Sequence, residues 1–132
     1  MPVEPTPDQL AELQAIAGGP DDGPLVMLNL NRYRDPAAYA RYGEVAMRGL
    51  ERIGGRVLWH APIKGTVIGE GDERFDDLIA VWYPSAAAFL GMISDADYLE
   101  GRDDRLEGLE RAVLLRCHAA DEPVLSAPEA AG

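Results

Sequence analysis

The sequence predicts an α+β domain with a four-stranded antiparallel sheet, its elements following the split βαβ, ferredoxin-like order. Two apolar segments, residues 25–31 and 78–83, carry hydrophobic side chains on both faces along most of their length, which is typical of central strands. The elements predicted along the chain follow the order strand, helix, strand, strand, helix, strand. In this topology the first and third strands lie at the centre of the sheet, and they coincide with the two most apolar segments.

An additional helix is expected before this domain, within residues 1–24. Thr6 is a favourable N-cap residue, Pro7 fits the first helical position, and Gln9 can complete a capping box. Apolar residues follow at helical spacing until the Gly-Gly-Pro sequence at 18–20 ends the helix. The first 24 residues are therefore interpreted as an arm and a helix outside the main domain.

The main domain is predicted to cover residues 25–118 and to begin with the strand at 25–31. Asp35 and Pro36 provide the cap and the first residue of the next helix, which is expected to end near Ile53. Apolar and tyrosine side chains repeat at helical spacing along this helix, and a glycine pair follows its last turn.

A second strand is predicted from Arg56 to Trp59. Pro62 interrupts it, because proline lacks the backbone donor that a strand ladder uses. Residues 66–68 are apolar and branched, and they are a candidate continuation of this strand. Which of the two parts pairs with the third strand stays open.

The third strand, residues 78–83, is expected to stop at Pro84, and Ser85 can cap a short apolar helix over residues 86–93. A charged helix then continues to about Arg111.

The last strand is predicted at residues 112–117, where apolar residues return. Residues 119–132 combine proline, alanine and acidic residues with few apolar anchors. They are expected to form a flexible acidic tail.

The composition excludes several classes of protein. The formal net charge is −11 and the isoelectric point is about 4.4, which disfavours binding to the phosphate backbone of a nucleic acid. No segment approaches the roughly 18 apolar residues of a membrane span, and the N-terminus lacks the basic and apolar regions of a signal peptide. We therefore expect a cytoplasmic protein with no nucleic acid and no membrane among its partners.

Metal and cofactor sites are not predicted either. The two histidines, His60 and His118, share no ligand spacing, and no glycine-rich phosphate loop is present. The single cysteine, Cys117, lies in an apolar segment and is expected to be an inert buried thiol. The sequence thus predicts a protein without metal or nucleotide cofactor.

Four short motifs occur in a fixed order along the domain: Asp35-Pro36-x-x-Tyr39-x-x-Tyr42, Gly54-Gly55-Arg56, Tyr83-Pro84-Ser85 and Asp97-Tyr98. In order and spacing they resemble a bacterial domain-of-unknown-function family of the dimeric α/β-barrel superfamily, over about residues 25–117. The resemblance implies a homodimer whose sheets face each other. The second apolar face of the central strands points to a partner subunit independently. No particular reaction is implied, because the superfamily includes cofactor-free monooxygenases, isomerases, heme-handling proteins and binding modules.

Candidate functional side chains lie where the apolar strands end. Asn29 and Asn31 end the first strand and Asp77 begins the third, and antiparallel neighbours bring these ends together. His60 joins them if the earlier part of the second strand pairs with the third. Glu70 joins them if the later part pairs instead, and the sequence does not decide between the two.

A carboxylate that orients a histidine suits proton transfer on a small carbonyl compound or phenol. We therefore assign His60 as the candidate catalytic base and Asp77 as the residue that orients it. The candidate substrate-binding residues are polar or aromatic side chains at the strand ends and on the flanking helices: Asn29, Asn31, Arg32, Tyr33, Tyr42 and Arg105. The alternative is a structural role for each, as a solvated strand end, a backbone-bonded histidine, a surface charge or a core tyrosine.

Two functional hypotheses follow. The first is a cofactor-free enzyme, an isomerase, cyclase or monooxygenase-like protein, acting on a small aromatic or polyketide-like organic molecule. The second is a non-catalytic module of the same fold that binds a small ligand or serves assembly. An enzyme requires the histidine and the carboxylate within hydrogen-bonding distance in a concave site, whereas a binding module requires only an apolar pocket.

Overall fold

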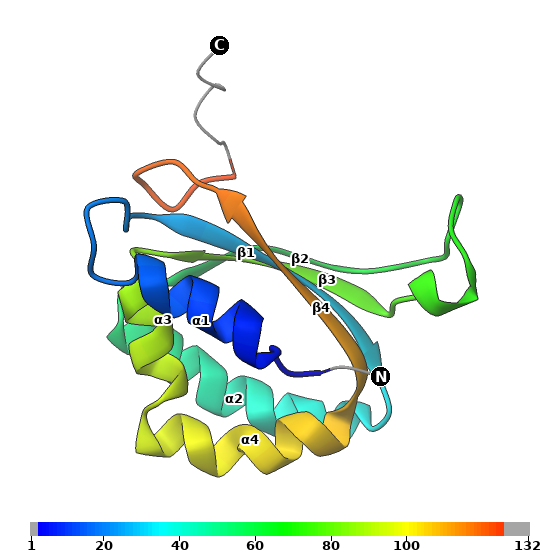
Figure 1. Cartoon of the computed structure of the whole chain (residues 1–132). Helices are drawn as coiled ribbons and strands as arrows, with labels where there is room; N and C mark the ends of the chain where they lie inside the picture. The colour runs from blue at the N-terminus through cyan, green and yellow to red at the C-terminus, as the bar shows by residue number, and fades with distance from the viewer. Residues whose placement is uncertain (1–2, 126–132) are drawn as a thin grey trace.

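The structure is a computed structural model, and it describes residues 3–125 of the chain. Figure 1 shows two layers, a twisted sheet and a layer of helices beneath it. The connection between the second and third strands extends past one end of the sheet, and residues 119–125, which follow the last strand, lie above the other end.

The sheet has four strands in the order β2-β3-β1-β4, and every neighbouring pair is antiparallel. The strands are β1 (Leu25–Tyr33), β2 (Arg56–Pro62), β3 (Asp77–Tyr83) and β4 (Leu109–His118). The two most apolar strands, β1 and β3, are central, which confirms the predicted fold class.

The helices of the described residues are α1 (Pro7–Ile16), α2 (Pro36–Arg52), α3 (Ala86–Ile93) and α4 (Ala96–Gly108), with a short 3-10 turn η1 (Gly71–Glu73) before β3. The predicted capping box of α1 is present, because Thr6 and Gln9 exchange side-chain-to-backbone bonds. The Asp35 carboxylate caps α2 by accepting bonds from the first backbone N–H groups of that helix.

The N-terminus of α3 is held by two side chains. Ser85 Oγ accepts a bond from Ala88 N–H, and the Asp22 carboxylate accepts bonds from Ala86 and Ala87 N–H at 2.7 and 3.1 Å. Burial acts to raise the pKa of Asp22, but hydrogen bonds from backbone N–H groups outweigh it and lower that pKa below its ordinary value. The linker after α1 is thereby tied to α3.

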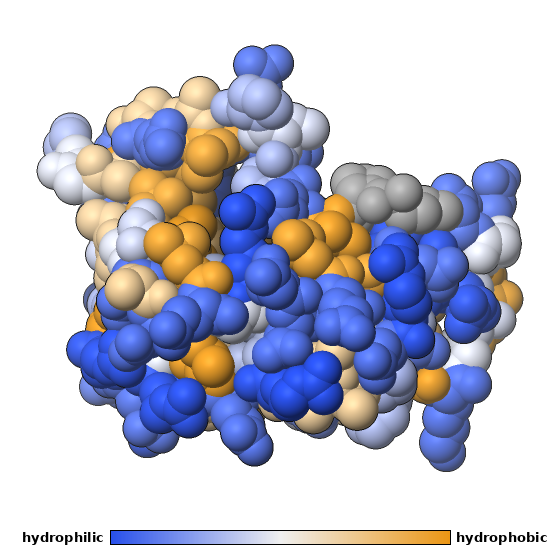
Figure 2. All heavy atoms as spheres, turned by 90° about the horizontal axis from the view of Figure 1, so that it is seen from below, coloured by the Kyte–Doolittle hydropathy of each residue, from blue (hydrophilic) through white to orange (hydrophobic). Residues whose placement is uncertain are grey.

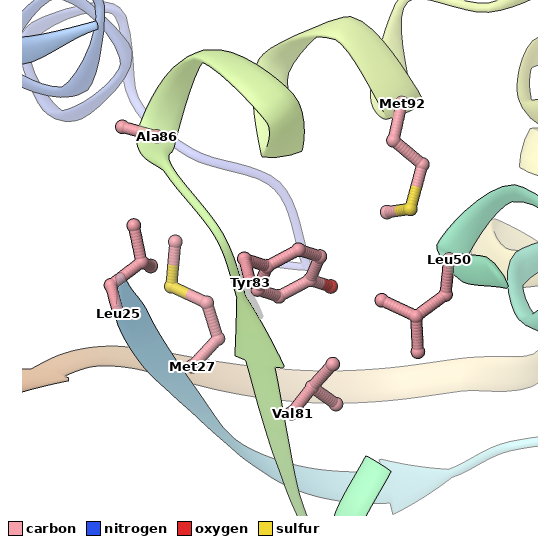
Figure 3. Packing of buried hydrophobic residues seen from close by; sticks show 7 residues of the cluster. All are labelled: Leu25, Met27, Leu50, Val81, Tyr83, Ala86 and Met92. Carbon is pink, nitrogen blue, oxygen red and sulfur yellow. The ribbon is translucent and has the colours of Figure 1, made fainter. Parts of the chain in front are cut away.

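The core lies between the sheet and the helices. Figure 3 shows its buried cluster, in which side chains of β1 and β3 meet side chains of α2 and α3: Leu25, Met27, Leu50, Val81, Tyr83, Ala86 and Met92. Leu13 and Ile16 of α1 pack against this cluster, so the N-terminal helix is part of the same core.

Several element boundaries differ from those predicted. β1 ends at Tyr33 rather than at 31, and β2 ends at Pro62 rather than at Trp59. Residues 66–68 do not continue β2 and form an irregular loop, and β4 begins at Leu109 rather than at 112. The earlier start of β4 follows from its pairing with β1, which extends to Tyr33 and includes a bulge at Glu110. The bulge places Glu110 and Arg111 together opposite Arg32, because it adds one unpaired residue to β4.

The face of the sheet that no helix covers is apolar except near the end of β1, where Arg32 lies, and we call it the open face. Side chains alternate between the two faces along each strand, so all four strands contribute to the open face. Its apolar side chains are Val26, Leu28 and Leu30 of β1, Leu78, Ala80 and Trp82 of β3, Val113, Leu115 and Cys117 of β4, and Trp59 of β2. Trp59 remains 51% exposed and Leu115 47% exposed, so part of this apolar surface is in contact with water.

The helix side has a different character. Seen from that side, the surface is mainly hydrophilic, with separated hydrophobic patches (Figure 2). Among the residues that the structure describes, no helix is long and apolar enough to cross a membrane.

Candidate functional site

The candidate site centres on Asp77, the first residue of β3. Asp77 lies opposite Asn31 of β1 and opposite Pro62 of β2 in the strand ladders. It shares the helix-facing side of the sheet with Val81, because residues of a strand alternate between faces. Its side chain is only 8% exposed, so the carboxylate needs hydrogen-bond donors from the protein.

Three side chains supply these donors. Asn31 Nδ2 donates to Asp77 Oδ1 at 3.1 Å, and the Tyr33 hydroxyl donates to Asp77 Oδ2. His60 Nε2 lies 3.0 Å from the same Oδ2. The observed pairing of β2 with β3 therefore brings His60, and not Glu70, to Asp77; Glu70 lies exposed before η1.

The contact with Asp77 favours one tautomer of His60. In the tautomer that donates from Nε2 to the carboxylate, the free lone pair lies on Nδ1. The His60 side chain is 53% exposed, whereas Asp77 is buried. The pair thus combines a fixed, oriented imidazole with access for a small molecule.

Tyr39 of α2 belongs to the same network. Its hydroxyl accepts a bond from Asn31 Nδ2 at 3.4 Å, and its ring centroid lies 5.0 Å from that of Tyr33. Burial raises the pKa of Tyr39 to about 12. The pKa of Tyr33 is also raised, mainly by burial and further by its bond to Asp77. Both phenols are therefore neutral donors at physiological pH.

Tyr42 and Arg105 form a second group beside α4. The Tyr42 hydroxyl lies 2.8 Å from the Tyr98 hydroxyl, and burial raises the pKa of Tyr42 well above its ordinary value. The Arg105 guanidinium lies 6.0 Å from the centre of the Tyr42 ring and donates to the Val3 carbonyl. Neither residue has a hydrogen bond to the three donors of Asp77 among the residues described.

Asn29 and Arg32 are also placed apart from His60. Asn29 Nδ2 donates to the Ile79 carbonyl at 3.1 Å, which ties β1 to β3. Arg32 lies on the open face, where its Nε bonds Glu110 Oε2 at 3.0 Å. The sheet therefore lies between Arg32 and the Asp77 carboxylate.

The placement of Arg32 and Asn31 on opposite faces of the sheet follows from the sequence alone, because neighbouring residues of a strand point to opposite faces. The sequence indicates less clearly that Tyr39 belongs to the network around Asp77. Its helical spacing with Tyr42 is equally typical of a core tyrosine, and only the structure shows its bond to Asn31.

One group of acids in the described residues has ligand-like geometry. The carboxylates of Glu70, Asp72 and Glu73 lie within 4.8 Å of one another, but all three are exposed. Such clusters are common on acidic surfaces, and this one includes none of the donors of Asp77.

Two cavities lie away from the Asp77 network. One, of about 500 Å³, lies between α2 and the start of β2 and includes Met47, Val57 and Pro123. The other, of about 220 Å³, lies on the open face and includes Trp59 and Leu125.

The comparison with protein families identifies the domain. The family model described as Domain of unknown function (DUF1330) matches residues 25–116. The chain belongs to this family. The DUF1330 region begins with β1 and ends within β4, close to the span over which the sequence motifs resemble such a family. All residues of the Asp77 network lie inside it, whereas α1 precedes it.

Solved structures place this DUF1330 protein among ferredoxin-like folds. A protein of unknown function from Rhodopseudomonas palustris is 35% identical, with a TM-score of 0.77, and the match covers 86% of this chain and 93% of that one. A protein of the dabb family with a ferredoxin-like fold, from Mesorhizobium loti, is 13% identical, with a TM-score of 0.53 and coverage of 74% and 98%. A Caulobacter crescentus protein provisionally named an antibiotic biosynthesis monooxygenase is 11% identical, with a TM-score of 0.52 and coverage of 83% and 98%.

The two more distant likenesses indicate the fold alone. Among curated proteins, none matches the chain.

Proposed function

We propose that this protein is a cofactor-free enzyme that transfers a proton on a small organic molecule. His60 acts as the base through Nδ1, and Asp77 holds the ring in that tautomer. A carboxylate behind an imidazole also stabilises the imidazolium that forms when the base accepts a proton. The observation that carries the proposal is the 3.0 Å contact between a half-exposed histidine and a buried aspartate.

The substrate class follows from the groups around Asp77. Tyr33 and Tyr39 offer neutral phenols and aromatic faces, and Asn31 adds an amide, while no cation is bonded to this network in the described residues. Such surroundings suit an uncharged aromatic or polyketide-like molecule with an acidic C–H or O–H group. Isomerisation, cyclisation or oxygenation could each begin with removal of that proton.

Hydrogen–deuterium exchange of a simple carbon acid tests this proposal without knowledge of the natural substrate. Ethyl acetoacetate, a minimal polyketide-like β-keto ester, is incubated in deuterium oxide with the protein, and loss of its methylene signal is followed by proton NMR. We expect the wild-type protein to accelerate exchange. His60→Ala should reduce the acceleration on the order of 10²-fold.

His118→Ala is the matched control, because His118 lies at the far end of β4 and has no contact with Asp77 among the described residues. It should exchange like the wild type, and both variants should retain the wild-type circular dichroism spectrum. Equal exchange rates for His60→Ala and the wild type would refute the role of His60 as a base.

The competing function is a binding or assembly module. The observation that favours it is the position of the two cavities, neither of which includes His60 or Asp77. In that case Asp77 is a structural junction of β1, β2 and β3. Tight binding of a small ligand with no acceleration of exchange, and a marked loss of stability in His60→Ala, would support this alternative.

We also propose that the protein self-associates through the open face. This face is apolar along the two central strands, and no element of the described chain covers it except near the end of β4. Packing two such faces together would remove their apolar side chains from water.

A further inference from the structure

The loop between β2 and η1, residues 63–70, contains two exposed apolar residues. We call this loop the arm from here on; it is distinct from the N-terminal segment. Val67 is 96% exposed and Ile68 is 94% exposed, the highest values among the large hydrophobic residues described. Figure 1 shows the arm extending past the end of the sheet and rising toward the open-face side. Two adjacent branched side chains left almost entirely in water suggest a contact that a single copy does not provide.

The described chain after β4, residues 119–125, lies at the opposite end of the open face, and we call it the strap. Trp82 Nε1 donates to the Ala120 carbonyl at 3.0 Å, which holds the strap over β3. Val124 and Leu125 line the 220 Å³ cavity together with Trp59 of β2. They are still 45% and 62% exposed, so the strap also has an apolar outer surface.

A two-fold axis between two copies could bring these two features together. If two open faces pack with the axis perpendicular to the strands, each copy is reversed end to end relative to the other. The arm of one copy then lies over the strap of the other, and the contact occurs twice. With the axis along the strands like ends would meet, so the acids Asp121 and Glu122 of the two straps would approach each other, and the two arms would lie at the same end.

The charges favour the first arrangement. The arm carries Lys64, the only lysine of the chain, and one acid, Glu70, at its junction with η1. The strap carries Asp121 and Glu122, and the chain as a whole has a formal net charge of −11. Placing Lys64 beside the two acids of a second copy offsets part of the repulsion between two acidic subunits.

We propose that the arm of each copy docks on the strap of a second copy, with Val67 and Ile68 against Val124 and Leu125, and Lys64 beside Asp121 and Glu122. This inference rests on the self-association through the open face proposed above. It adds the relative direction of the two sheets and the residues that fix it.

Carbodiimide cross-linking tests the contact, since this reagent joins an amine directly to a carboxylate. Lys64 supplies the only side-chain amine, so its cross-linked peptides are unambiguous. Equal amounts of unlabelled and nitrogen-15-labelled full-length protein are mixed, cross-linked and digested, and the peptides are mapped by mass spectrometry. We expect mixed-isotope peptides that join Lys64 to Asp121 or Glu122, and their absence from Lys64→Arg.

Light scattering on the same samples separates the two proposals. A protein that stays near 14.3 kDa at micromolar concentration refutes self-association, and with it the arm–strap contact. A dimer whose Lys64 cross-links elsewhere, or not at all, leaves self-association standing and overturns the arm–strap contact.

The double variant Val67→Ser, Ile68→Ser gives an independent readout. We expect the dimer dissociation constant to rise roughly tenfold or more, because two apolar side chains leave the interface. The melting temperature of the diluted, monomeric protein should not change, since both side chains are exposed there. An unchanged dissociation constant would also overturn the proposal.

Discussion

The contact between the end of α4 and the start of α2 gives a sharp test of the packing that positions the site. Gly108 lies against the backbone of Tyr39, and its carbonyl accepts bonds from the N–H groups of Arg34 and Asp35 at 2.8 and 3.2 Å. A Cβ atom added at Gly108 would lie 2.6 Å from Tyr39 N and 2.9 Å from Tyr39 Cα. Because these are backbone atoms, no side-chain rotation can relieve the overlap.

We expect Gly108→Ala to lower the free energy of unfolding by about 1–3 kcal/mol, the usual cost of overpacking. The better helix propensity of alanine offsets less than about 1 kcal/mol of this, because Gly108 is the last residue of α4. At roughly 4 °C per kcal/mol for a chain of this size, the melting temperature should fall by roughly 4–12 °C. The Tyr39 hydroxyl should also shift relative to Asn31, so the site is disturbed with the fold.

Gly43→Ala is the matched control, because Gly43 lies within α2 and a Cβ atom there would meet nothing within 4 Å. It should raise the free energy of unfolding by about 0.5–1 kcal/mol. Thermal unfolding followed by circular dichroism measures both variants. A Gly108→Ala protein that melts within 1 °C of the wild type, or a Gly43→Ala protein that melts as low as Gly108→Ala, would contradict this description of the interface.

Two further changes test local interactions. Asp22→Ala removes an acceptor at the N-terminus of α3 and should cost about 0.5–2 kcal/mol at neutral pH by thermal unfolding. Since the pKa of Asp22 is lowered in the folded protein, the ionised carboxylate should stabilise the fold above about pH 4, and this stabilisation should be lost as the pH falls through the folded pKa. The melting temperatures of the variant and the wild type should therefore become equal in acid. A constant difference in melting temperature down to pH 2 would argue against an ionised cap. Tyr42→Phe removes one of two hydroxyls that bond each other and should lower the free energy of unfolding by about 0.5–1.5 kcal/mol, measured by urea unfolding. Adding Tyr98→Phe to this variant should lower it little further. Fully additive losses of stability would mean that the two hydroxyls do not interact.

Much of the fold could be predicted because local signals agree with one another. Thr6, Asp35 and Ser85 each mark a helix start that the structure contains, and the apolar character of β1 and β3 matches their central positions. The boundaries that differ depend on contacts between distant residues. The bulge at Glu110 follows from pairing with β1, and no residue near it signals a bulge.

The candidate site could be predicted in part for the same reason. Strand order brings Asn31 and Asp77 together, but the choice between His60 and Glu70 depends on which residues of β2 pair with β3. That register is fixed by long-range packing, which a local pattern does not contain. The substrate-binding role predicted for Tyr33 stays a prediction. In the structure its hydroxyl is directed to Asp77, because β1 continues two residues beyond Asn31.

The position of β1 has a consequence for how the chain is synthesised. β1 is the first strand to leave the ribosome, yet its neighbour β4 is the last, and Leu25 pairs with His118. Until β4 has emerged, one edge of β1 has no partner, and its apolar residues can pair with other nascent chains. Folding of this domain must therefore wait until β4 has emerged, and its speed is limited by closing a loop that includes nearly the whole domain.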